Sequence, residues 1–341
     1  MTVIVLTGCS SGLGARVLAQ LVRHLPSGAT ILSGYRSTSP PPSPPGLSDG
    51  STLAWIPLDL ASLASVDQFV RQVETKLGSN SSIDCVLLNA ATWNNSYRPT
   101  KVDDAEWSQE FVVNHLAQHR LVEGLLPLLS AGSRGRIVFT SSSLQNSLPR
   151  EVESIEQVVS ILRDPNDKSS TARSRYASSK ILQSLSYFHL AHHAQHLDIV
   201  GVSPGFVPTT GLSRDAPWWQ QLLMKWVVYY LPFCSSEEQG TRKILECLNY
   251  FLPSRPFPSN LDEQLPTSIP REPSTTSHSV ASSRLVFHPP SLSPLESKSS
   301  APVYSELREL LGGIGRDPGA GKDDDQWNGL SETIMGRRRE R

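Results

Sequence analysis

A tyrosine and a lysine stand four residues apart, at Tyr176 and Lys180. At this spacing, two side chains project from the same face of a helix. A phenol with a reference pKa near ~10 is a poor proton shuttle at neutral pH, and an adjacent ammonium group lowers that pKa by favouring the phenolate. The pair therefore predicts a proton-transfer site in which Lys180 adjusts the pKa of Tyr176.

A glycine-rich turn over residues 7–14 follows an apolar run and precedes a helical pattern. Glycines permit a tight turn and a close backbone approach, so a pyrophosphate can bind at the free N–H groups of the helix N-terminus. The alternative is a structural turn, but the strand–turn–helix context favours nucleotide binding. The candidate residues are Gly8, Ser10, Ser11, Gly12, Leu13 and Gly14.

Serines occupy positions 141–143, directly after an apolar run over residues 136–140. Open α/β sheets build their sites at the carboxyl ends of strands, where a hydroxyl can hold a substrate oxygen. The alternative for these residues taken alone is an ordinary serine-rich turn.

Short apolar runs alternate with longer segments of helical period. We expect strands at residues 2–6, 29–33, 53–58, 83–88, 136–140 and 199–202. Apolar stripes predict helices around residues 17–22 and 66–77. The pattern predicts an α/β fold with a doubly wound, Rossmann-like parallel sheet and helices on both faces.

Two proline-rich stretches interrupt this alternation. Residues 40–45 include five prolines where a crossover helix is expected, so we predict a loop there. Residues 253–283 are rich in Pro, Ser and Thr and are predicted to be an insert or linker without fixed structure. We expect one domain with its core over residues 1–252, followed by this linker and then, over 284–341, a strand, short helices and a basic tail.

The composition excludes several classes of function. The 341 residues include 31 Lys+Arg and 32 Asp+Glu, a net charge of -1, which gives no general attraction to nucleic acid. The four cysteines are widely spaced and favour a reducing compartment. Because there is no signal peptide and no apolar stretch long enough to span a bilayer, we expect a cytoplasmic protein. Because the net charge is close to zero, we expect that it does not bind nucleic acid.

In their order along the chain, these motifs resemble the short-chain dehydrogenase/reductase family from residue 2 to about residue 252. Residues 7–14 resemble the cofactor turn of that family. The resemblance implies further cofactor contacts at Asp59, Leu60, Asn89, Lys180, Pro204, Gly205, Val207 and Thr209. It also implies a catalytic tetrad of Asn114, Ser142, Tyr176 and Lys180.

The resemblance implies that Tyr176 exchanges a proton with the substrate oxygen while a hydride moves between nicotinamide and the substrate carbon. Lys180 would bind the ribose hydroxyls, Ser142 would bond the carbonyl oxygen, and Asn114 would keep a water in the proton relay. The expected function is that of an NADP(H)-dependent oxidoreductase of alcohols and carbonyls. The alternative is a non-catalytic NADP-binding regulatory protein.

The residues at the end of the second expected strand indicate whether the cofactor is NAD(H) or NADP(H). The sequence Gly34-Tyr35-Arg36 lacks the acidic residue that would hold a ribose 2′-hydroxyl. Arg36 stands where a guanidinium can bind a 2′-phosphate, although an arginine can also simply end an exposed strand. We therefore expect NADP(H) as the cofactor.

Departures from the family pattern point to a subgroup. Tyr176 follows Ser142 by 34 positions, an unusually long gap, which predicts a lid or substrate-gating insert over residues 146–174. Motifs such as Asn114-His115-Leu116 resemble the branch of protochlorophyllide reductases and retinol dehydrogenases, with 3-ketosteroid reductases as a rival likeness. These branches imply a small lipophilic substrate.

Two further patterns each allow more than one interpretation. Residues 217–233 are rich in Trp and Tyr. This density predicts a flap that covers a lipophilic substrate and makes peripheral contact with an intracellular membrane. The alternative is that these rings simply pack on the core. Four histidines between residues 189 and 196 have a spacing that can bind zinc, but a solvated helix face explains them better, so no metal is expected. The sequence leaves the oligomeric state open.

Overall fold

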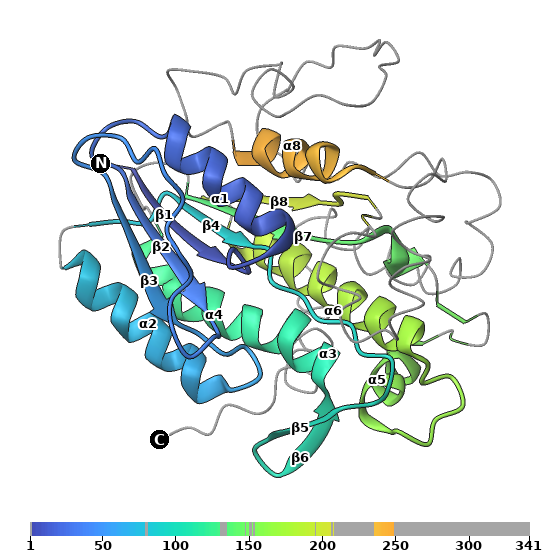
Figure 1. Cartoon of the computed structure of the whole chain (residues 1–341). Coiled ribbons are helices and arrows are strands. Elements are labelled where there is room, and N and C mark those ends of the chain that lie inside the picture. Colours follow the sequence, from blue (N-terminus) through green and yellow to red (C-terminus); the bar gives the residue numbers. More distant parts are fainter. Residues whose placement is uncertain are drawn as a thin grey trace, which may run out of the picture.

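The computed structural model describes residues 2–248, apart from 79–80, 130–134, 147, 150–151, 153, 195, 206 and 208–234. In this part of the chain, a parallel six-stranded sheet has the order β3-β2-β1-β4-β7-β8 (Figure 1). The strands are β1 (Val3–Thr7), β2 (Thr30–Tyr35), β3 (Thr52–Pro57), β4 (Cys85–Leu88), β7 (Arg136–Thr140) and β8 (Asp198–Val202). The doubly wound fold is therefore confirmed.

The six strands begin and end within two residues of the expected positions. The agreement is close because β1, β4 and β7 are buried along their whole length and, apart from polar residues at the ends of β1 and β7, read as continuous apolar runs. Strand β4 is shorter than expected because Ile83 forms only an isolated bridge, with Leu129.

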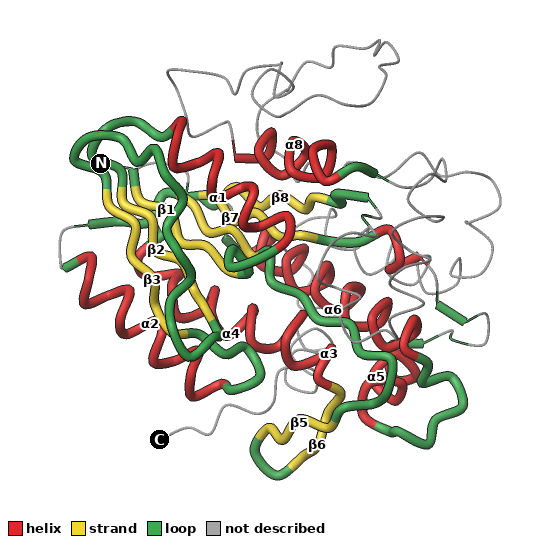
Figure 2. The backbone as a smooth tube through the Cα atoms, in the orientation of Figure 1, coloured by secondary structure: helices red, strands yellow, loops and turns green. Residues whose placement is uncertain are grey.

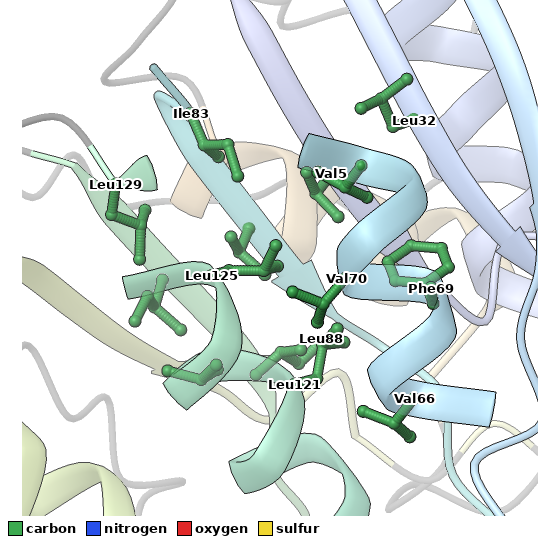
Figure 3. Close-up of a cluster of buried hydrophobic side chains, with 14 of the residues drawn as sticks. Val5, Leu32, Val66, Phe69, Val70, Ile83, Leu88, Leu121, Leu125 and Leu129 are labelled. Carbon is green, nitrogen blue, oxygen red and sulfur yellow. The ribbon is translucent and has the colours of Figure 1, made fainter. Parts of the chain in front are cut away.

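Helices cover both faces of the sheet (Figure 2). Helices α1 (Gly12–His24) and α8 (Glu237–Leu248) pack on one face. The other face carries α2 (Leu63–Leu77), α4 (Ala117–Leu125) and α6 (Ala172–His193). The apolar stripe of α2 is buried as predicted, with Phe69, Val70 and Leu121 among the side chains that meet over the sheet (Figure 3). Each such side chain contributes about 1.5–3 kcal/mol on burial.

The proline-rich crossover between β2 and β3 is a loop, as predicted. Its later part is tied to the segment between α1 and β2, because the Ser48 hydroxyl donates to the Leu25 carbonyl at 2.9 Å and the Ser51 hydroxyl accepts from the Ala29 N–H at 3.0 Å. Its proline-rich part is in contact with the sheet edge, where the Trp55 indole donates to the Ser43 hydroxyl at 3.4 Å. A crossover without a helix is therefore held by local hydrogen bonds.

A helical insert and a hairpin extend the fold beyond the sheet. The hairpin of β5 (Pro99–Val102) and β6 (Ala105–Ser108) was not expected, and it leads into the short helix α3 (Gln109–Phe111). Helix α5 (Ile155–Arg163) lies within the long gap before Tyr176 and buries its apolar face against α6. The described part of the segment that was expected to form a lid therefore packs against α6 as part of the hydrophobic core.

No helix in the described residues is both long and apolar enough to cross a bilayer. The predicted boundaries at residues 252 and 283, and the segment after them, lie outside those residues.

Candidate active site

The turn between β1 and α1 has the geometry of a phosphate cradle. Gly8 and Gly12 have φ angles of 69° and 58°, a region that favours glycine. A Cβ atom on Gly8 would lie 2.5 Å from the backbone nitrogen of Ala90, and one on Gly14 would overlap the Gly8 carbonyl oxygen. The turn can therefore approach both β4 and a ligand closely because these positions lack side chains.

The N-terminus of α1 is available to an anion. Its N-cap, Ser11, makes no side-chain capping hydrogen bond, and no acidic residue lies in the first turn. Uncapped N–H groups and the positive end of the helix dipole are suited to a pyrophosphate. The residues of this turn therefore fit a dinucleotide cofactor.

The side chain of Asn89 joins three strand ends at this edge. Its Nδ2 donates to the Gly8 carbonyl at 3.0 Å, and its Oδ1 accepts from the Thr140 hydroxyl at 3.2 Å. The Ala90 N–H donates to the Thr7 hydroxyl at 3.3 Å. Asn89 thus holds the glycine turn and links it to the end of β7.

Tyr176, Ser142 and Lys180 lie together at the same edge. Tyr176 is buried on α6, and the Ser142 side chain, which follows β7, lies near enough to act on its pKa. Burial raises the pKa of Tyr176 to about 12, and the neighbouring Ser142 side chain only partly opposes this rise. Nζ of Lys180 lies 5.9 Å from the centre of the Tyr176 ring, and burial lowers the pKa of Lys180 itself to about 7. The lowering of the Tyr176 pKa by Lys180 stays a prediction.

The ammonium group of Lys180 is the end of a hydrogen-bonded chain that includes two glutamines, Gln183 and Gln118, that sequence reasoning missed. Nζ donates to the Thr140 carbonyl at 2.7 Å and to Oε1 of Gln183 at 3.0 Å. Nε2 of Gln183 donates to Oε1 of Gln118 at 2.7 Å, and Nε2 of Gln118 donates to the Ala90 carbonyl at 2.5 Å. A buried amide relay thus connects Lys180 to the strand end beside the cofactor turn.

Asn114 lies in a π-helical turn (Val112–Leu116) and is fully buried. Its amide both accepts from the Thr92 N–H at 2.7 Å and donates to the Thr92 carbonyl at 2.9 Å. It also donates to the Ser179 hydroxyl at 3.0 Å, and Ser179 in turn donates to the Tyr176 carbonyl at 2.7 Å. The side chain therefore connects the loop after β4 to the helix that carries Tyr176.

Known proteins are similar in sequence to this chain. The family model for short chain dehydrogenase matches residues 2–151. The short-chain dehydrogenase/reductase GME11359 of Pestalotiopsis microspora is 32% identical over 217 residues, which cover 62% of this chain and 72% of that protein. The chain belongs to the short-chain dehydrogenase/reductase family.

Two other relatives agree with the predicted branch of this family. Retinol dehydrogenase 14 of Mus musculus is 32% identical over 156 residues, covering 41% of this chain and 44% of that protein. Protochlorophyllide reductase B of Hordeum vulgare is 27% identical over 274 residues, covering 72% of this chain and 66% of that protein. The likeness to 3-ketosteroid reductases stays a prediction.

The other predicted cofactor contacts of this short-chain dehydrogenase/reductase are distributed around the sheet edge. Arg36 is exposed after β2, and Leu60 is buried in the core. Oδ1 of Asp59 accepts from the Ala61 N–H at 3.0 Å. Ser10 is exposed, and Leu13 is buried against the sheet.

The segment after β8 is described in part. Gly205 has a φ angle of 89°, and a Cβ atom there would overlap the Ser235 hydroxyl. Val207 is buried in the cluster under α1 and α8, and Pro204 precedes it in a loop. Thr209 and the aromatic stretch 217–233 lie outside the described residues, as do the side chains of three of the four histidines. Among the residues that the structure describes, no group of three or more potential ligands could hold a metal ion.

Proposed function

We propose that the chain is an NADP(H)-dependent oxidoreductase that interconverts a lipophilic alcohol and its carbonyl. Membership of the family supports an oxidoreductase that acts on CH–OH and C=O groups and binds a nicotinamide cofactor. The observation that carries the proposal is that Tyr176 lies beside Ser142 and Lys180 on the sheet edge that also carries the glycine turn.

The chain's own residues would handle the proton and the substrate oxygen. A bound nicotinamide dinucleotide would donate or accept the hydride. Ser142 would donate a hydrogen bond to the substrate oxygen, and Tyr176 would give it a proton during carbonyl reduction. A Tyr176 pKa of about 12 keeps the phenol protonated over the working range, which suits an acid in the reductive direction. Lys180 would bind ribose hydroxyls, and Asn114 would hold a water in the relay.

Replacement of Tyr176 tests the activity. We expect Tyr176→Phe to lower carbonyl reduction by a factor on the order of 10²–10⁴ because the proton donor is lost. NADPH binding, measured by fluorescence titration, should change little, since the turn holds most of the cofactor.

The matched control for this test is Tyr187→Phe. Tyr187 lies on the same helix, and its buried hydroxyl has no hydrogen-bond partner among the described residues. Near-wild-type turnover by Tyr176→Phe on a confirmed substrate would instead favour the alternative, a non-catalytic NADP-binding regulator.

The choice of NADP(H) is supported by Arg36 and by the absence of an acidic side chain after β2. A guanidinium can bind a 2′-phosphate through two parallel hydrogen bonds. Arg36→Ala should weaken NADPH binding and leave NADH binding unchanged, whereas Arg71→Ala, exposed on α2, should alter neither. Equal affinity of the native chain for the two dinucleotides would contradict this choice.

A small lipophilic substrate and peripheral membrane contact through residues 217–233 are part of the proposal. The density of aromatic residues in that stretch supports them, since Trp and Tyr combine an apolar body with a polar tip. Cytoplasmic location and the absence of nucleic-acid binding stay predictions. Flotation of the full chain with liposomes tests the membrane contact, and a chain that stays at the bottom of the gradient contradicts it.

A further inference from the structure

The loop that follows β4 is fixed at Thr92. Both the N–H and the carbonyl of Thr92 are hydrogen-bonded to the side chain of Asn114, at 2.7 and 2.9 Å. Because Asn114 is fully buried, this part of the loop is held against the π-helical turn.

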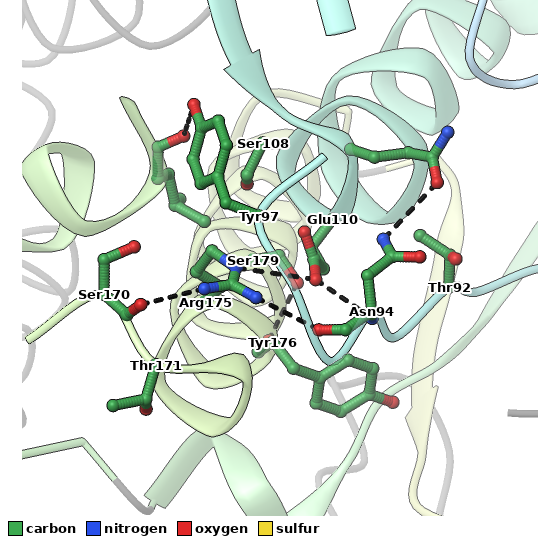
Figure 4. A network of polar contacts seen from close by, with 12 residues as sticks. Thr92, Asn94, Tyr97, Ser108, Glu110, Ser170, Thr171, Arg175, Tyr176 and Ser179 are labelled. Carbon is green, nitrogen blue, oxygen red and sulfur yellow. Dashed lines mark hydrogen bonds and ion pairs between the residues drawn. The ribbon is translucent and has the colours of Figure 1, made fainter. Parts of the chain in front are cut away.

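The same loop is fixed again at Asn94, two residues later (Figure 4). The Asn94 N–H donates to Oε1 of Glu110 at 3.0 Å, and its carbonyl accepts from Nη2 of Arg175 at 3.0 Å. Arg175 and Glu110 are 3% and 0% exposed, and Nε of Arg175 lies 3.6 Å from Oε1 of Glu110. A buried ion pair therefore holds the loop to α3 and α6, and Arg175 is the residue before Tyr176.

Trp93 lies between these two anchors. Its indole ring packs on the ring of Tyr176 with centroids 4.9 Å apart and planes inclined by 39°. Trp93 is only half-buried, although Asn94 beside it is 1% exposed. A fixed, partly open aromatic surface therefore lies next to the candidate proton donor.

A substrate oxygen that reaches the Tyr176 hydroxyl brings its carbon skeleton close to this surface. Aromatic rings gain more from packing on an indole than aliphatic groups of the same size, because offset or tilted ring pairs are favoured. The main chain of Trp93 is already ordered by its neighbours, so little conformational entropy is lost on binding.

We propose that Trp93 is a specificity-determining residue and that the site favours carbonyl compounds with a flat aromatic ring attached to the carbonyl carbon. This proposal rests on the proposed function. The juxtaposition that carries it is an indole held by Thr92 and Asn94 against the ring of Tyr176.

A pair of ketones of the same skeleton tests it. Acetylnaphthalene carries a flat aromatic ring system, whereas acetyldecalin is its saturated, non-planar counterpart. With the full chain and its nicotinamide cofactor, we expect a higher kcat/KM for acetylnaphthalene. Trp93→Leu should lower the ratio of the two kcat/KM values by about 3- to 10-fold, mainly through KM for the aromatic ketone.

Two further variants separate specificity from folding. Trp93→Phe keeps an aromatic ring and should retain most of the preference. Trp55→Leu changes a half-buried indole on β3 and should leave the ratio unchanged.

The outcomes separate this proposal from the proposed function. Equal kcat/KM values in the native chain, or an unchanged ratio in Trp93→Leu, overturn the role of Trp93 while the oxidoreductase assignment stands. A chain that binds the cofactor but turns over no alcohol or carbonyl overturns the assignment and the role of Trp93 with it.

Discussion

The ammonium group of Lys180 is buried among neutral partners, a carbonyl and an amide, with no carboxylate beside it among the described residues. Burial lowers its pKa from 10.5 to about 7. The unfolded chain therefore binds one more proton than the folded chain between these two values. Because the unfolded state binds more protons there, the free energy of unfolding rises with pH across this window.

We expect this contribution to disappear in Lys180→Met. As pH increases above about 7, the free energy of unfolding of the native chain should rise relative to that of this variant. Urea unfolding at several pH values between neutrality and about pH 9 measures it. Lys76→Met, on the exposed face of α2, should show no such slope. A difference that does not vary with pH would contradict the lowered pKa.

The amide relay gives a second prediction at this scale. Gln183→Glu places a carboxylate where Oε1 now accepts from Lys180, which favours the charged ammonium and raises its pKa. If ribose binding uses the charged lysine, the alkaline limit of kcat/KM for the cofactor should move to higher pH. An unchanged pH profile would show that Gln183 does not control the charge of Lys180.

Sequence reasoning identified Tyr176 and Lys180 because their spacing has a local meaning on a helix. Gln118 and Gln183 were not identified, because these two partners are 65 residues apart and their contact depends on how two helices pack. Gln183 does lie one helical turn after Lys180, a spacing that could have suggested a contact. Gln118 has no comparable spacing to Lys180 that could have suggested its role.

At the scale of elements, the turn between β1 and α1 depends on the absence of side chains. Gly8→Ala should impair dinucleotide binding severely, because the new Cβ would lie 2.5 Å from the Ala90 nitrogen at a φ angle of 69°. Gly28 has a similar φ angle of 78°, but a Cβ atom there would meet nothing within 4 Å. Gly28→Ala should therefore cost only the conformational strain, about 1–2 kcal/mol, and bind NADPH normally. Similar losses of NADPH affinity in both variants would show that Gly8→Ala acts through backbone strain alone and not through the close contact with Ala90.

The strands were predictable because buried parallel strands are continuous apolar runs, whereas the β5–β6 hairpin was not. The hairpin strands are four residues each and include Lys101 and Glu106, so they contain no continuous apolar run. Its turn contains Asp103 at a φ angle of 52°, a left-handed conformation that aspartate tolerates. The pair Asp103-Asp104 is a weaker sequence signal for a hairpin turn than a pair that contains glycine. Short, partly buried strands of this kind are defined by the neighbours they pack against rather than by their own sequence pattern.

At the scale of the whole molecule, three apolar clusters hold the described part of the chain together. Two lie on the faces of the sheet, and the third joins α5 to α6 and the π-helical turn. The third cluster packs directly behind the helix that carries Tyr176 and Lys180. The long insert therefore supports the candidate site from the side away from the sheet.

Leu162 on α5 distinguishes this structural role from that of a lid. It is 0% exposed within the third cluster, so Leu162→Ala should lower the free energy of unfolding by about 2–5 kcal/mol through lost burial and the cavity left behind. Leu47→Ala is the matched control, because Leu47 is 39% exposed and its truncation should change stability by less than about 0.5 kcal/mol. Thermal or urea unfolding measures both.

A gating lid would respond differently, since closure over a substrate changes KM and kcat and leaves the stability of the free chain nearly unaltered. If Leu162→Ala retains native stability and alters only the kinetic constants, α5 moves during turnover. If stability falls and the remaining folded fraction keeps its KM, the insert is a fixed layer. We expect the second result, because the buried face of α5 is part of the same core as α6, and moving it would expose that core to water.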